Sequence, residues 1–143
     1  MRGMLVINKK KRQAIINYYK EANVEKMLVV FLKKEGNKYK ADEIIKPSRQ
    51  DYKYITRNYT SLKSRALKGC IEECINNVYD GILLVHNHRK GLIPLMSTND
   101  RKANRQILNY IKNNTSITFG SGVYASKRLT YILEDKLTIA QKI

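Results

Sequence analysis

The sequence contains few of the features that mark membrane, secreted and multidomain proteins. Among its 143 residues there is no tryptophan, and there are only two prolines, two cysteines and two histidines. No apolar run approaches the roughly 20 residues of a membrane span, and the first residues lack the long apolar segment of a signal peptide. No stretch reads as a linker. We therefore expect a single cytoplasmic domain over residues 1–143 that crosses no membrane.

The two cysteines, Cys70 and Cys74, are four residues apart in a stretch with helical periodicity. Side chains at this spacing point along the same face of a helix, which does not favour a disulfide between them. The position favours small apolar core residues, and a metal site built on the Cys-x-x-x-Cys spacing is the alternative.

Acidic residues are scarce as well. Lys and Arg outnumber Asp and Glu by 28 to 12, which gives a formal net charge of +16. Such an excess favours a polyanionic partner, either nucleic acid or an acidic protein surface. Because most of the basic residues are spread along the chain, a purely solubilising role is an equal alternative.

Tyrosine is the abundant aromatic residue, with ten in the chain. The tyrosines of the first half, interleaved with basic residues, would suit a stacking surface for single-stranded nucleic acid. The pattern favours instead half-buried sheet and helix residues whose hydroxyls reach water.

Hydrophobic periodicity predicts alternating helices and strands. Asn8 is placed to cap the first helix, and Gly36-Asn37 marks a hairpin turn. Ile75 and Val78 complete the predicted apolar face of the second helix. The predicted helices cover residues 9–21, 61–78 and 97–113, and the predicted strands cover 27–32, 38–45, 52–59, 82–85, 116–124 and 129–133. This order predicts an α+β fold, an α/β sandwich whose mostly antiparallel or mixed central sheet is flanked by helices.

The two histidines, His86 and His88, directly follow the apolar strand predicted over residues 82–85. Alternate residues of a strand point to one face, so the two rings could bind one ion together. Asp100, in the first turn of the next predicted helix, could add an oxygen ligand. Two nitrogens and one oxygen leave a tetrahedral zinc with one open position, which is the arrangement of a catalytic site.

Such a site also needs a carboxylate that takes a proton from water, and Glu25 is the best candidate because it directly precedes the buried strand 27–32. Each component has a simpler interpretation. The alternatives are two histidines that are neighbours by chance, a Glu25 that is a solvated residue at a helix end, and a Ser97 and Asp100 that form the pattern of a helix N-cap.

Two stretches carry a family resemblance. His86-Asn87-His88, followed by Ser97-Thr98-Asn99-Asp100, resembles the His-x-His and Ser-x-x-Asp signature of the JAB/MPN domain metallopeptidases, which is called the JAMM motif. Glu25 matches the position of that family's upstream glutamate. Arg89 stands where the family usually has a proline. The resemblance implies the JAB/MPN architecture, which is similar to that of the cytidine deaminases.

The resemblance also implies a role for each residue. Zinc (Zn2+) would be held by His86, His88 and Asp100, Glu25 would activate water, and Ser97 would donate a hydrogen bond to the tetrahedral intermediate. The implied activity is zinc-dependent hydrolysis of an amide or isopeptide bond in a protein substrate, such as the tail of a ubiquitin-like modifier.

Two alternatives stay open on the same fold. The RadC-like branch shares His-Asn-His at this position, and the basic charge would suit a nucleic-acid-associated role. A scaffold that has lost its catalytic activity is the other alternative. The contiguous His-Asn-His is not the HNH nuclease motif, whose residues are dispersed over a ββα unit.

Overall fold

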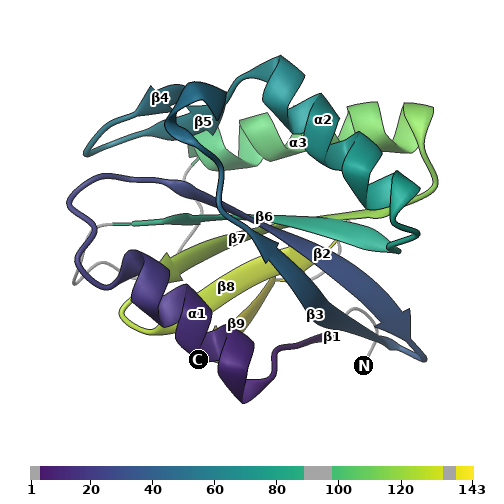
Figure 1. Ribbon diagram of the computed structural model, residues 1–143, viewed down its shortest axis with the longest axis horizontal. Helices are drawn as coiled ribbons and strands as arrows, with labels where there is room; N and C mark the ends of the chain where they lie inside the picture. The colour runs from purple at the N-terminus through teal and green to yellow at the C-terminus, as the bar shows by residue number, and fades with distance from the viewer. Residues whose placement is uncertain (1–3, 89–97, 134–137) are drawn as a thin grey trace.

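A curled, mixed β-sheet with helices on both faces forms the body of the molecule (Figure 1). The computed structural model describes residues 4–88, 98–133 and 138–143. Within these residues the sheet has seven strands in the order β1-β3-β2-β6-β7-β8-β9. They are β1 (Met4–Val6), β2 (Met27–Glu35), β3 (Lys38–Ile45), β6 (Gly81–Asn87), β7 (Thr118–Ala125), β8 (Arg128–Leu133) and β9 (Thr138–Lys142).

The remaining elements are three helices and a small hairpin. The helices are α1 (Lys9–Tyr19), α2 (Ser64–Asn76) and α3 (Thr98–Asn114), and a short 3-10 turn covers Arg49–Asp51. Among the described strands, β4 (Tyr52–Ile55) and β5 (Thr60–Leu62) pair only with each other. The predicted α+β class, with a mixed sheet flanked by helices, is confirmed. Among the described residues, no helix combines the length and the apolar character needed to cross a bilayer.

Strand β6 lies at the centre of the sheet. It runs antiparallel to β2 and parallel to β7. Every residue of β6 is buried, as its apolar sequence predicts for a strand covered on both faces. The carboxyl ends of β6 and β7 therefore meet the amino end of β2 at one edge of the sheet, and this edge carries both histidines.

The sheet separates two hydrophobic cores. Alternate residues of β6 pack to opposite sides: Leu83 and Val85 lie in the core beneath α1, whereas Ile82 and Leu84 lie in the core beneath α2 and α3. This alternation follows from the two-residue period of a strand. Burial of these side chains supplies most of the stabilisation, at about 25 cal/mol per Å² of apolar surface removed from water.

The strand predicted over residues 52–59 is wrong, because the chain turns back within it. The Thr56 hydroxyl accepts from the Tyr59 N–H at 3.0 Å and donates to the Tyr59 carbonyl at 3.0 Å. These local bonds close a turn and produce the β4-β5 hairpin. A threonine hydroxyl can bond to nearby main-chain groups in place of the hydrogen bonds of a continuous strand. The predicted helix start at 61 is therefore also wrong, because residues 60–62 belong to β5.

The predicted end of the second helix is wrong as well. Helix α2 ends at Asn76, and Val78 has a positive φ of 60°. The N–H groups of Val78 and Tyr79 bond back to the carbonyls of Ile75 and Cys74, which is the Schellman arrangement. This turn directs Val78 into solvent, where it is 75% exposed, and Ile75 is 43% exposed, so neither belongs to the core face.

Helix α1 begins at the predicted residue but ends at Tyr19, two residues before the predicted end, and the two cysteines form no disulfide, as expected. The Asn8 side chain caps α1 by accepting from the Lys11 N–H at 2.8 Å. Both cysteines are free; Cys70 is partly exposed and Cys74 is fully buried. The Cys74 thiol donates to the Gly81 carbonyl, and burial raises its pKa to about 11. Cys74 is therefore an unreactive core residue.

Candidate metal centre

The end of β6 brings the two histidine rings together. His86 pairs with Met27 of β2, and the His88 N–H continues the parallel ladder by donating to the Tyr124 carbonyl at 3.0 Å. Because the two residues alternate with Asn87, both side chains lie on one face. Their Nε2 atoms are 3.3 Å apart.

This nitrogen-to-nitrogen distance suits a shared cation. Zinc–nitrogen bonds of about 2.0–2.1 Å at a tetrahedral angle put two histidine nitrogens roughly 3.3 Å apart. The Nε2 atoms of His86 and His88 lie at this separation. The spacing of these two nitrogens is therefore the one that a shared zinc ion requires.

Glu25 is the third member of this cluster. A carboxylate oxygen of Glu25 and one ring nitrogen each of His86 and His88 all lie within 4.8 Å of one another. His86 is buried, and the other two are partly buried. Two imidazoles and a carboxylate are ligands that zinc accepts, and a carboxylate at this range is also close enough to act on water at the ion. The structure therefore brings Glu25 and both histidines into one group.

Main-chain hydrogen bonds hold Glu25 in place. The Asn87 side chain accepts from the Lys26 N–H at 2.8 Å and donates to the Val24 carbonyl at 3.1 Å. On the other side, the Glu25 N–H donates to the Thr56 carbonyl of the β4-β5 hairpin at 2.7 Å. The residues on both sides of Glu25 are thus tied to the strand that carries the histidines.

Sequence reasoning missed Asn87 as a functional residue. The available signal was its place between the two histidines, because a residue between two that share a strand face must point to the opposite face. It is only 7% exposed, and a buried amide needs hydrogen-bond partners. It finds them in the segment that carries Glu25.

Tyrosine hydroxyls fix the start of β2 beside the cluster. Tyr52 accepts from the Met27 N–H at 2.8 Å and donates to the Met27 carbonyl at 3.1 Å, and Tyr18 donates to the same carbonyl at 2.8 Å. Burial, and then the hydrogen bond with Tyr52, raise the pKa of Tyr18 well above its usual value. The interpretation of these tyrosines as packing residues is confirmed, but their hydroxyls bond to main chain. Tyr54 and Tyr59 are exposed.

A lysine lies next to the cluster. The Lys26 ammonium is 4.0 Å from the centre of the Tyr18 ring. Partial burial lowers the pKa of Lys26, and the positive charge of Lys46 lowers it further. The Lys26 ammonium is therefore packed on an aromatic face, which is a favourable contact for a partly desolvated cation.

The two remaining predicted site residues cannot be placed with respect to the histidines. Ser97 lies outside the described residues. The backbone of Asp100 lies in the first turn of α3, and the structure does not describe its side chain. The helix itself approaches the histidines, because Ala103 and Asn104 line a cavity together with His86.

No family model matches the sequence, and no curated protein matches it either. Among solved structures, the chain is similar to protein DSY2949 from Desulfitobacterium hafniense, whose solution structure superimposes with a TM-score of 0.53 at 13% sequence identity. The match covers 97% of this chain and 90% of that chain. At this identity the similarity concerns the fold alone, and it extends over nearly the whole of both chains.

Proposed function

We propose that the protein is a zinc-dependent peptidase or isopeptidase of the JAB/MPN type. The observation that supports this proposal is the convergence of Glu25, His86 and His88 within 4.8 Å, from two segments far apart in the sequence. These are three of the five residues that the resemblance to that family assigns to the site. In this proposal Asp100 completes the zinc ligands, and the sheet with its three helices is a JAB/MPN architecture.

The proposed reaction is hydrolysis of an amide or isopeptide bond. A bound zinc ion acidifies water and polarises a carbonyl group. Glu25 accepts the proton from the attacking water and delivers it to the leaving amine, so that the amine departs neutral. Ser97 donates a hydrogen bond to the oxygen that becomes negative during attack. Asn87 keeps the Glu25 segment in position during both proton transfers.

The cavity beside His86 suggests how a protein tail would bind. Residues 59–62 of the β4-β5 hairpin line it, together with Leu67, Leu84 and Ile107. Strand β5 pairs only with β4 among the described strands, so its other edge can accept an extended peptide. The backbone of a peptide tail bound along β5 would extend toward His86. An extended tail of this kind is what a ubiquitin-like modifier would present.

Metal content and hydrolysis of matched variants test this proposal. Wild type should carry about one zinc per chain, and His88→Ala should lose most of it. Glu25→Gln should retain zinc but lose hydrolysis of a ubiquitin-like protein bearing a fluorogenic C-terminal amide, by about 100-fold or more. Glu21→Gln, an exposed residue in the same connection, is the matched control and should behave as wild type.

Three results would contradict the proposal. Wild type free of zinc after purification without chelators would remove the metal site. Unchanged turnover in Glu25→Gln would remove the assigned base. Full zinc occupancy with no amide hydrolysis on any modifier tested would favour a scaffold.

A nucleic-acid-associated role is the second candidate. The net charge of +16 favours it, as does the exposed pair Tyr54 and Tyr59, whose ring centres are 5.6 Å apart. The Lys53 ammonium lies 5.6 Å from the Tyr54 ring centre. Exposed aromatic rings beside cations are the usual components of a surface that binds single strands.

A further inference from the structure

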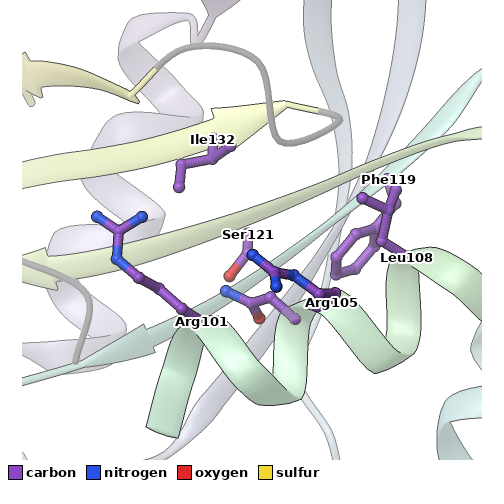
Figure 2. A pocket seen from close by; sticks show the side chains of 7 residues that line it. Arg101, Arg105, Leu108, Phe119, Ser121 and Ile132 are labelled. Carbon is purple, nitrogen blue, oxygen red and sulfur yellow. The ribbon is translucent and has the colours of Figure 1, made fainter. Parts of the chain in front are cut away.

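A second pocket lies between α3 and the strands β7 and β8, and Figure 2 shows it from close by. Arg101 and Arg105 extend from α3 at i and i+4, so they share one face of the helix. The Arg105 guanidinium is directed toward Ser121, which lies on the sheet at the floor of the pocket. Ser121 is only 4% exposed. Two cationic side chains thus border a buried hydroxyl.

The chemistry of this pocket favours an anion. A guanidinium offers only hydrogen-bond donors, and its planar fork matches the two oxygens of a carboxylate. Leu108, Phe119 and Ile132 add apolar surface to the lining, while both arginine side chains are exposed to solvent. The helix also has a cationic excess: Asp100 is its one acidic residue, against four basic residues, Arg101, Lys102, Arg105 and Lys112.

The pocket adjoins the candidate metal centre. Asn104 and Ser121 line both this pocket and the cavity that contains His86. Ser121 pairs with Leu84, two residues before His86 on the neighbouring strand. One strand spacing of about 4.8 Å and two residues of about 3.3 Å each put the backbone of Ser121 roughly 8 Å from that of His86 along the sheet. An extended peptide covers this distance with about two residues.

We propose that the Arg101–Arg105 pocket binds a carboxylate of the peptide substrate, about two residues from the bond that is cleaved. The assignment to a substrate rests on the function proposed above, whereas carboxylate binding by the pocket does not. The carboxylate can come from an acidic side chain or from a free C-terminus, because both present the same two oxygens. The two sources imply different enzymes: cleavage next to an acidic residue, or cleavage close to the end of a chain.

Binding of short peptides to the full chain tests the pocket without any catalytic readout. One pair of probes is acetyl-Ala-Ala-Glu-Ala amide and its Gln counterpart, and the other is acetyl-Ala-Ala-Ala with a free or an amidated C-terminus. Titrations at low ionic strength, followed through the backbone amide resonances of the protein, give the affinity and report on Ser121. We expect wild type to bind one charged probe about tenfold more tightly than its neutral partner.

Arg101→Gln/Arg105→Gln should abolish this preference and leave the affinity for the neutral probe unchanged. Lys112→Gln removes the same kind of charge from the far end of α3 and should retain the preference. A preference for the Glu probe assigns an acidic side chain, and one for the free C-terminus assigns a chain end. Equal binding of charged and neutral probes by wild type would overturn the proposal, as would an equal loss in Lys112→Gln.

The same titration with His88→Ala separates the two proposals. A preserved preference in that variant, together with a wild type that lacks zinc, would leave the carboxylate pocket standing without the hydrolase. A zinc-containing, active wild type with no preference among the probes would leave the hydrolase standing and overturn the pocket.

Discussion

Asn87 connects the histidine strand to the segment that carries the proposed base. Its amide group makes one bond to each residue that flanks Glu25, at 2.8 Å to Lys26 and 3.1 Å to Val24. Since both partners are main-chain groups, other side chains at positions 24 and 26 would preserve the connection, except for proline at position 26, which lacks the N–H. The requirement falls on Asn87 itself, which must both donate and accept.

Replacing Asn87 by Leu should separate metal binding from catalysis. The change leaves the Lys26 N–H and the Val24 carbonyl without their partner, which costs about 1–3 kcal/mol of stability. We expect zinc content to stay at the wild-type level, because the histidines point to the other face, while hydrolysis falls by about tenfold or more as Glu25 loses its fixed position. Metal analysis and turnover with the fluorogenic modifier measure the two effects.

A destabilised control shows whether the loss is specific. Leu5→Ala removes a buried side chain of β1, away from the site, at a cost of about 2–5 kcal/mol. It should keep turnover at temperatures where it is folded. Equal losses of turnover in both variants, or loss of zinc in Asn87→Leu, would contradict the positioning role.

At the scale of elements, the end of α2 stores strain. Val78 occupies the position after the helix cap at which glycine is preferred, with φ of 60°. A β-branched side chain in this conformation costs about 1–2 kcal/mol. Its 75% exposure means that the side chain contributes little burial in return.

Val78→Gly should therefore stabilise the protein. We expect a gain of about 0.5–1 kcal/mol, because relief of the left-handed strain exceeds the extra chain entropy of glycine in the unfolded state. The midpoint of thermal unfolding should rise by a few degrees. Val78→Ala keeps a Cβ atom and should gain much less, so equal gains in the two variants would show that the strain does not arise from the left-handed backbone.

Local sequence patterns predicted those elements whose conformation depends mainly on nearby residues. The strand over 38–45 has the predicted bounds, and the Asn8 cap begins α1 as expected. The turn at Thr56 was missed because the residues around it, Tyr54, Ile55 and Tyr59, all favour strands. The position of the turn depends instead on the hydrogen bonds of the Thr56 hydroxyl with Tyr59. Strand β1 was missed because three residues carry too little pattern, and its partner β3 is remote in the sequence.

The candidate site was predictable to a similar extent. The two-residue period of a strand places His86 and His88 on one face, and the position of Glu25 before a buried strand suggested its role. That β2 lies directly beside β6, with Met27 opposite His86, depends on pairing between distant segments that no local pattern encodes. The contribution of Asn87 depends on that same pairing.

At the scale of the whole molecule, the charge of +16 produces a field that attracts polyanions. If nucleic acid is a partner, affinity for a single-stranded oligonucleotide should fall steeply between about 50 mM and 200 mM salt, because binding releases counterions. Tyr54→Ala/Tyr59→Ala should weaken it further through loss of stacking. Fluorescence anisotropy measures both effects. No affinity at low salt would eliminate this role, and weak binding insensitive to the tyrosines would reduce it to non-specific attraction.

The pairing of β2 with β6 also affects when the site forms during folding. Lys26 and Asn87, which bond across this pair, are 61 positions apart in the sequence. Contacts of such long range require a large loss of chain entropy before they contribute, so they form late. A nascent chain that has not yet reached His88 has no place for an ion. If zinc binds as proposed, we expect it to bind after the sheet has collapsed, and the bound ion would then slow unfolding.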